Sequence, residues 1–220
     1  MLVNADLSVP AVVGADEHRW VASPQPGVMR MMLDRLGGEH ARATSLVRYA
    51  PRSSFPVHGH PGGEEVLVLE GTFSDDSGDY GAGWYLRNPP GSAHRPSSKD
   101  GALIFVKLWQ MSAADTLTVR IDTRDPAAWR RDGEHDVCPL HASDHESVSL
   151  RRLRPGQRLE PDARGGAELL VVDGRLDEAG KSYDRGSWLR LPPGARAGYV
   201  AGAAGAMLYL KTGHLAAALA

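Results

Sequence analysis

The sequence predicts an all-β protein with two barrels, and three observations lead to this prediction. Glycine and proline are frequent, with 25 and 15 residues among 220, and no long stretch has the period of an amphipathic helix. Short apolar stretches recur between turn-forming residues, as expected for many short strands. Finally, GGEEVLVLEG (62–71) and GWYLRNPPG (83–91) return 103 residues later as GGAELLVVDG (165–174) and GSWLRLPPG (186–194). Such a repeat indicates two copies of one structural unit.

The repeat divides the chain into four parts. We expect an N-terminal arm over 1–27, a first barrel over 28–111, connecting strands over 112–140 and a second barrel over 141–215. The arm contains Trp20 and a turn-rich stretch, so we expect it to wrap the first barrel or to reach a partner subunit in a homodimer.

Composition and charge exclude several classes of function. The net charge of -2, with both signs mixed, leaves no basic surface for a nucleic acid. No apolar run approaches the roughly 18 residues of a membrane span, and no export signal is visible at the N-terminus. The single cysteine, Cys138, excludes an internal disulfide and suits a reducing compartment. We therefore expect a cytoplasmic protein without nucleic-acid or membrane partners.

The strands of the first barrel follow in order. Residues 28–36 are rich in methionine, which predicts a strand against the core or at an oligomer contact. A further strand is expected over 43–49. Residues 66–69 are all apolar, which predicts a strand buried on both faces. Further strands over 84–87 and 103–111 are expected to complete the barrel.

Four side chains in this half are arranged as metal ligands. His58 and His60 are two residues apart, so on a strand both imidazoles point to one face. Glu64 follows across a Pro-Gly-Gly turn, and the turn after strand 84–87 leads the chain back to His94. Three imidazoles and one carboxylate suit Fe(II), Mn(II), Ni(II), Zn(II) or Cu(II). We therefore predict one divalent metal ion in the first barrel.

The same residues carry a family resemblance. From its H-x-H onward, the stretch with His58, His60, Glu64 and Gly71 resembles the first motif of the cupin superfamily, G-x5-H-x-H-x3,4-E-x6-G. Its opening glycine is missing here, since Ser53 stands near that position.

The second cupin motif, G-x5-P-x-G-x2-H-x3-N, follows at the expected distance. Gly83, Pro89, Gly91 and His94 match it, and its final asparagine is Ser98 in this chain. About ten fixed positions at fixed spacing make the resemblance specific.

The segments in and around the two motifs are similar to those of ChrR-type cupins. They read LVRYAP, FPVHGHPGGEEVLVLEG and IFVKLWQM. This resemblance implies a bicupin of two jelly-roll barrels, with zinc or Fe(II), or else nickel or manganese, held by His58, His60, Glu64 and His94. The metal centre itself would carry any chemistry, since no separate catalytic side chain is identified.

Two classes of function follow from the resemblance. Some ChrR-like cupins are iron-dependent dioxygenases that cleave β-diketones or hydroxyacetophenones, which implies a small-molecule ligand. Others are the metal-binding domains of zinc-dependent anti-sigma factors, which implies a non-catalytic regulator or sensor. The sigma-binding domain of those factors needs paired Cys and His ligands, and this chain has one Cys, which argues against binding of a sigma factor.

The second barrel lacks the ligand set, because the equivalent positions read Pro161, Ala163, Ala167 and Ala197. A packed core is the expected occupant, with a metal-free cavity or an interface as alternatives.

Two local points depend on the three-dimensional arrangement. Glu64 either coordinates the metal or supports a ligating histidine by a hydrogen bond. Asp75, Asp76 and Asp79 are predicted to lie in a solvated hairpin turn.

Overall fold

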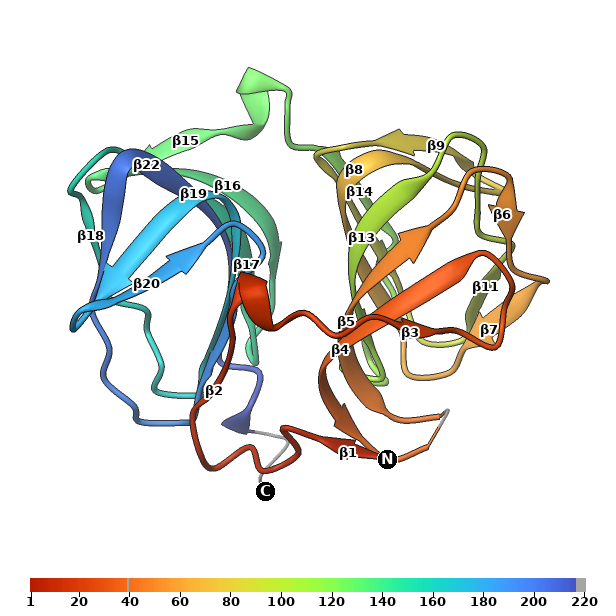
Figure 1. Ribbon diagram of the computed structural model, residues 1–220, viewed down its shortest axis with the longest axis horizontal. Coiled ribbons are helices and arrows are strands. Elements are labelled where there is room, and N and C mark those ends of the chain that lie inside the picture. The colour runs from red at the N-terminus through yellow and green to blue at the C-terminus, as the bar shows by residue number, and fades with distance from the viewer. Residues whose placement is uncertain (39, 217–220) are drawn as a thin grey trace. The chain divides into compact units, whose positions relative to one another are not determined.

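The computed structural model describes residues 1–38 and 40–216 and is all-β, as predicted (Figure 1). It divides into two compact units. The first comprises Met1–Ala5 and Arg19–Arg124, and the second comprises Asp6–His18 and the chain from Asp125 on.

The first unit is built around a sheet in the order β1-β4-β5-β13-β8-β10-β14, with a separate two-stranded sheet of β7 and β11. Its strands are β1 (Leu2–Val3), β3 (Val21–Ala22), β4 (Val28–Leu36), β5 (Arg42–Tyr49), β6 (Ser53–Ser54), β7 (His58–His60), β8 (Glu64–Asp75), β9 (Gly78–Gly81), β10 (Trp84–Asn88), β11 (Ser92–His94), β12 (Ser97–Ser98), β13 (Ala102–Leu108) and β14 (Val119–Asp122).

Strand β8 is the central element of this unit, since it pairs with both β10 and β13. Val66 and Val68 belong to the apolar core of the barrel together with Val47 and Ile104. Leu67 alternates to the other face of the sheet and is also buried, so this strand is covered on both faces as predicted. Glu64, the first residue of β8, lies at one end of this core.

The second unit repeats the arrangement, with the sheet order β15-β16-β17-β22-β19-β21-β2. Its elements are β2 (Ala11–Val13), the 3-10 helices η1 (Ala15–Glu17) and η2 (Pro126–Ala128), β15 (Arg130–Asp132), β16 (His135–Ala142), β17 (Ser147–Leu153), β18 (Arg158–Leu159), β19 (Ala167–Glu178), β20 (Lys181–Asp184), β21 (Trp188–Leu191) and β22 (Tyr199–Thr212).

The N-terminal segment contributes strands to both units. β1 and β3 pair with β4 in the first unit. β2 pairs instead with β21 in the second unit, with Ala11 opposite Arg190. In the second unit, β19 and β20 begin 103 residues after β8 and β9, so the sequence repeat is a structural repeat.

One glycine pair shows why the backbone pattern of the repeat persists. Gly71 and Gly174 have φ of 69° and 70°, which favours glycine. A Cβ atom would lie 2.0 Å from the carbonyl oxygen of Gly101 in the first case and 2.1 Å from that of Gly205 in the second. A larger residue at either position would meet backbone that cannot rotate away.

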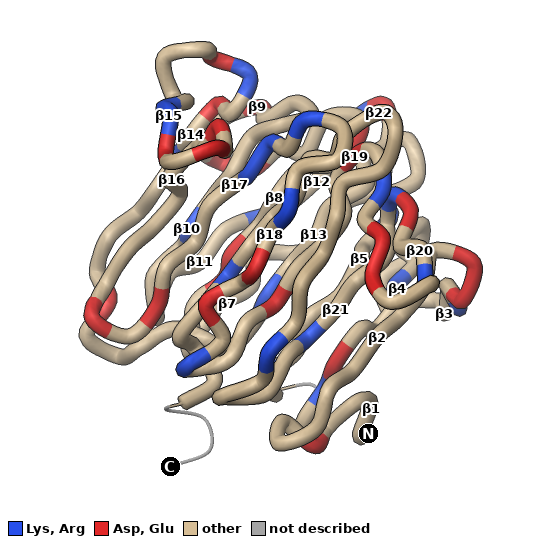
Figure 2. The backbone as a smooth tube through the Cα atoms, turned by 90° about the vertical axis from the view of Figure 1, so that its left-hand side faces the viewer, with Lys and Arg blue, Asp and Glu red and all other residues tan. Residues whose placement is uncertain are grey.

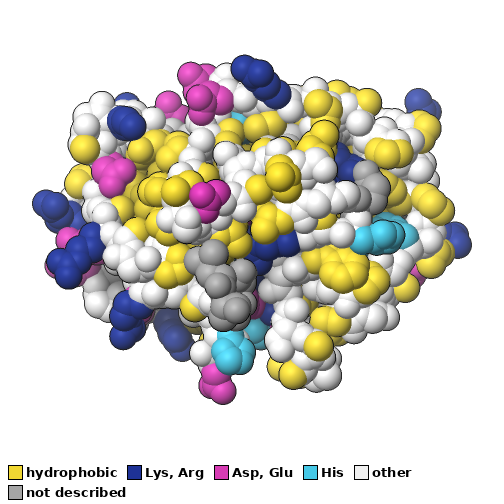
Figure 3. Space-filling view, turned by 90° about the horizontal axis from the view of Figure 1, so that it is seen from below, with side chains coloured by type: hydrophobic (Ala, Val, Ile, Leu, Met, Phe, Trp, Pro, Cys, Tyr) yellow, Lys and Arg dark blue, Asp and Glu magenta, His cyan; other side chains and the backbone are white. Residues whose placement is uncertain are grey.

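Basic and acidic residues are interspersed along the backbone of both units (Figure 2). The face seen in Figure 3 likewise mixes apolar, charged and polar side chains. Within residues 1–38 and 40–216, no helix has the length and apolar character needed to cross a membrane.

Candidate metal centre

Two short paired strands position the three histidines. His58 and His60 lie on β7 and His94 lies on β11, with His58 opposite His94 and His60 opposite Ser92. Because residues two apart share a face, the register places all three rings together. One ring nitrogen from each lies within 4.8 Å of the others.

Glu64 lies beside this triad. Nε2 of His60 is 3.0 Å from Nε2 of His94, and Oε2 of Glu64 is 3.6 Å from the first nitrogen and 3.4 Å from the second. Two nitrogen ligands at a right angle, each about 2.1 Å from one ion, are separated by about 3.0 Å. The spacing of these donor atoms therefore fits a shared metal ion. His60, Glu64 and His94 are buried, while His58 is partly exposed to the cavity side.

The tautomers of two rings support the same conclusion. Nδ1 of His58 lies 3.0 Å from the carbonyl oxygen of Pro56, and Nδ1 of His94 lies 3.2 Å from Oδ2 of Asp75. A carbonyl and a carboxylate only accept hydrogen bonds, so each Nδ1 carries the proton. Nε2 of each neutral ring then presents its lone pair to the centre of the cluster. A cation satisfies lone pairs that otherwise face one another.

Electrostatics differ between the two buried histidines. Burial, opposed in part by the charge of Glu64, lowers the pKa of His60 and keeps this ring neutral. Burial also disfavours a charged His94, but its hydrogen bond to Asp75 and the charge of Glu64 outweigh that effect and raise the pKa of His94. Binding of a metal to His94 therefore competes with a proton.

Asp75 is a site residue that sequence reasoning missed. The prediction of a solvated hairpin is wrong for Asp75, because its side chain is only 1% exposed and contacts His94. The long strand β8 ends at Asp75 and places its carboxylate next to the ring of His94. Burial alone would raise the pKa of Asp75, but the hydrogen bond to His94 lowers it overall. An acidic residue at the end of a long strand was the available signal.

A polar chain supports Glu64. Nδ2 of Asn88 donates to Oε2 of Glu64 at 2.9 Å, and Oδ1 of Asn88 accepts from Arg120 at 2.7 Å. Arg120 lies on β14, which pairs with β10. Such partners orient the atoms that face a metal. Neither residue belongs to a motif, so sequence spacing could not identify them.

The candidate ligands open onto a cavity of about 300 Å³ in the first unit. Val47, Ile104 and Val106 provide apolar walls, and Arg30 and Arg35 line the cavity from β4. Burial and the charge of Glu64 raise the pKa of Tyr49, so its phenol remains neutral. The cavity thus combines an apolar wall, two guanidinium groups and a histidine cluster.

Three of the four equivalent positions in the second unit are packed in or against its core. Ala163 and Ala167 are buried in its core, and Ala197 packs against that core. These three positions hold the packed core that was predicted, whereas the fourth, Pro161, lines a cavity.

The fold and the histidine cluster together define the class: a bicupin with a candidate metal site in its first barrel. Residues 8–112, just under half of the chain, match the family described as the ChrR cupin-like domain. The resemblance predicted from the two motifs is confirmed. No curated protein sequence matches the chain.

Solved structures show the same two-barrel fold. A protein from Nostoc punctiforme, provisionally named as a dioxygenase, is similar with a TM-score of 0.76 at 12% identity, over 95% of this chain and 84% of that one. The bacterial pirin of Escherichia coli in complex with nickel(II) gives 0.67 at 15% identity, over 92% and 98%. Oxalate decarboxylase of Bacillus subtilis, which has Mn(II) centres, gives 0.64 at 12% identity, over 92% and 77%.

Proposed function

We propose that this protein binds one divalent metal ion through His58, His60, Glu64 and His94 and acts as an Fe(II)-dependent dioxygenase on a small oxygenated substrate. The observation that carries the proposal is the convergence of the three ring nitrogens within 4.8 Å at the wall of a cavity. Fe(II) is among the ions that this imidazole-rich donor set suits, and the set leaves positions open for other ligands. When bound, such an ion would polarise a chelating substrate and leave a position at which dioxygen could bind.

The side chains of the cavity support a β-diketone or an aryl ketone as substrate. The enolate of a β-diketone, formed by loss of one proton, carries a negative charge, and Arg30 and Arg35 place two positive charges on the cavity wall. Arg30 is held by a 2.9 Å hydrogen bond to Ser23, and Arg35 donates to the carbonyl of Gly38. Two fixed guanidinium groups would orient the substrate's oxygens.

The remaining wall suits the rest of such a molecule. Phe55, Val106 and Leu108 offer apolar surface for alkyl or aryl groups. The neutral phenol of Tyr49 can donate a hydrogen bond without adding charge. The cavity of about 300 Å³ lies at the lower limit of ordinary ligand pockets, which fits a small substrate.

A second candidate function is a non-catalytic zinc-binding regulator or sensor. The match of residues 8–112 to the ChrR cupin-like domain favours it, since that domain is named after an anti-sigma factor. The single cysteine of the chain argues against the zinc-bound sigma-binding domain that such regulators carry. Under this proposal the same four residues would hold zinc.

Metal analysis followed by oxygen-consumption assays separates the two functions. Protein purified without added metal is analysed for its ion, loaded with Fe(II) and given a panel of β-diketones and aryl ketones. Repeated turnover that is lost in His60→Ala and kept in His40→Ala supports the dioxygenase, because His40 lines the cavity outside the triad. Stoichiometric zinc without turnover supports the regulator. Full metal affinity in His60→Ala would overturn both.

A further inference from the structure

The second barrel contains a cavity of its own, of about 200 Å³. Its walls come from β17, β22 and the segment that contains β18, and all of its lining residues belong to the second unit. The residues that line it are His135, Ser147, Ser149, Arg151, Leu159, Glu160, Pro161, Asp162, Leu210 and Thr212.

Strand register shows that this cavity is the counterpart of the one in the first barrel. Ser45 pairs with Val106 there, and Ser149 pairs with Leu210 here. Val47, two residues after Ser45, is therefore equivalent to Arg151. Each of these residues lines the cavity of its own barrel.

The two cavities differ in the residues at equivalent strand positions. Pro161 stands in the second barrel where His58 stands in the first, and two further strand positions have become polar. Ala43 pairs with Leu108, whereas their counterparts Ser147 and Thr212 pair as two hydroxyl residues. The second barrel has lost the metal ligands and has a guanidinium group and two hydroxyls at strand positions that are apolar in the first barrel.

The guanidinium group of Arg151, at the wall of this cavity, has an N–H group that can still donate a hydrogen bond. Its Nε is buried and, among the described residues, has no hydrogen-bond partner. One of its terminal nitrogens lies 3.8 Å from Oδ2 of Asp132, whose side chain is 60% exposed, so this pair is weak. A buried N–H group without a partner is costly, which indicates a site for an acceptor.

We propose that this cavity binds a short-chain monocarboxylate without metal. The edge of a guanidinium formed by Nε and one terminal nitrogen matches a carboxylate with two parallel hydrogen bonds. Ser149 adds a hydroxyl beside Arg151, and Leu159 and Leu210 provide apolar surface for a short alkyl chain. The volume lies below the ~300–1,000 Å³ of ordinary ligand pockets, which limits the chain to a few carbons.

Two acidic residues line the cavity, so a ligand with one carboxylate fits better than a ligand with two. Asp162 is engaged by Arg164, with contacts of 2.6 to 3.1 Å, so its charge is largely compensated. Glu160 is exposed and lines the same cavity. A second negative group on the ligand would be repelled by Glu160.

Binding of butyrate to the full-length protein in the presence of a chelator tests the proposal. We expect saturable binding of butyrate, much weaker binding of the neutral amide butyramide and no binding of glycerol. In ¹⁵N-labelled protein, the Nε–H resonance of Arg151 is assigned as the one that is missing in Arg151→Met. This resonance should shift on titration with butyrate. Arg151→Met should weaken binding by about tenfold or more, as expected for the loss of charge-assisted hydrogen bonds.

Three control variants keep the test specific. Arg152→Met removes an equal charge one residue away, where Arg152 lies 4.3 Å from the ring of Trp129, and should leave butyrate affinity unchanged. Arg30→Met and His60→Ala alter the first barrel and should leave the shift of the Arg151 resonance unchanged, so failure of the proposed dioxygenase would not affect this result. If Arg151→Met does not fold, Arg151→Lys replaces it. This variant keeps the positive charge and removes the two parallel N–H groups of the guanidinium.

Three outcomes would overturn the proposal. They are no response of the Arg151 resonance at millimolar butyrate, equal affinity for butyrate and butyramide, and unchanged affinity in a folded Arg151 variant. Binding of glycerol with the same shift of this resonance would indicate a polyol site instead.

Discussion

Oδ2 of Asp75 lies 3.2 Å from Nδ1 of His94 and holds that ring with Nε2 toward His60. Asp75 is separated from His94 in the chain by strands β9 and β10, yet the two side chains contact each other at one cluster. A carboxylate behind a ligating histidine fixes the ring and increases its basicity.

Asp75→Asn should therefore weaken metal binding without removing a ligand. We expect a loss of about 10- to 100-fold in affinity, the usual cost of losing such a supporting group. Competition with a chromophoric chelator measures it. Asp79→Asn serves as the control, since Asp79 is exposed on β9, and equal affinities in the two variants would contradict the role of Asp75.

Glu64→Gln tests direct coordination. We predict that Glu64 is a ligand, because its Oε2 lies within 3.6 Å of both His60 and His94, so the variant should lose more than about 100-fold in affinity. A loss of only about 10- to 100-fold would indicate a supporting hydrogen bond. Unchanged affinity would contradict both roles. The parallel variant Asn88→Ala, which removes the donor to Glu64, should lose less than Glu64→Gln.

Metal affinity should rise with pH from about 6 to about 8. Hydrogen bonding to Asp75 and the charge of Glu64 overcome the effect of burial and raise the pKa of His94, so below that pKa the ring holds a proton which the metal must displace. His60, whose pKa burial lowers, is already neutral in this range. Calorimetry in two buffers of different ionisation enthalpy should detect release of a proton at the lower end of this range and less release at its upper end. Affinity that is flat across this range would contradict the assignment of His94.

Gly71→Ala should destabilise the fold more than Gly91→Ala. Both glycines have positive φ, 69° and 84°, and so share the cost of about 1 kcal/mol for placing alanine in this region. Only at Gly71 does the new Cβ meet backbone, 2.0 Å from the oxygen of Gly101, whereas nothing lies within 4 Å at Gly91. We expect a further ~1–3 kcal/mol from this clash. Urea unfolding of the pair measures the difference, and equal midpoints would show that the clash is relieved elsewhere.

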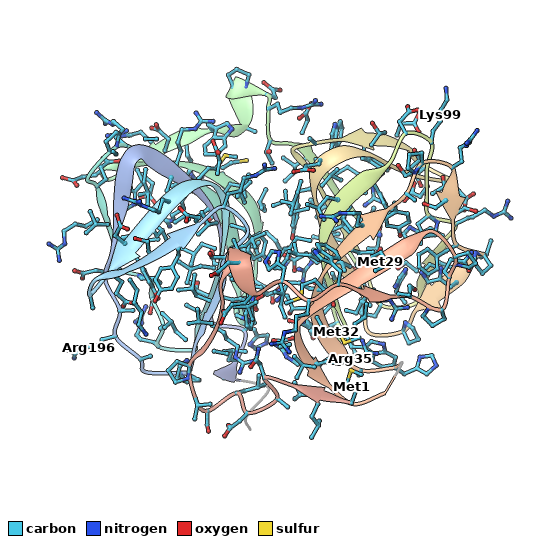
Figure 4. All side chains as sticks on the ribbon, in the orientation of Figure 1. Met1, Met29, Met32, Arg35, Lys99 and Arg196 are labelled. Atoms are coloured by element: carbon cyan, nitrogen blue, oxygen red, sulfur yellow. The ribbon has the colours of Figure 1, made fainter. Side chains whose placement is uncertain are left out.

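The chain should form a homodimer through the face of β4 that carries Met29. Met29 is 36% exposed and is labelled in Figure 4. Light scattering should give twice the chain mass at micromolar concentration and a monomer for Met29→Asp. Val12→Asp on β2 changes a residue that is more exposed, at 46%, and should remain dimeric. A monomeric mass for the unmodified chain would refute the prediction.

Much of the fold could be predicted because its determinants are local. Turn glycines and prolines mark the strand ends, and the repeat displays them twice, so two barrels follow from spacing alone. His58 and His60 share a face by the pleat of one strand, and a single turn returns the chain to His94. The family match over residues 8–112 was predictable for the same reason.

The remainder depended on which strands become neighbours. Asp75, Asn88 and Arg120 come from three strands, β8, β10 and β14, and meet the ligands only through sheet pairing and hydrogen bonds. Arg30 reaches the same cavity from β4. Contacts of this kind join residues far apart in the chain, and no spacing rule encodes them.

The second barrel shows the same division. Sequence comparison alone revealed the loss of the ligands at Pro161, Ala163, Ala167 and Ala197. That Arg151 lines a cavity there, with Nε buried and lacking a partner among the described residues, was decided by tertiary structure. The direction of a side chain into a barrel depends on strand register, and register is set by pairing across the whole sheet.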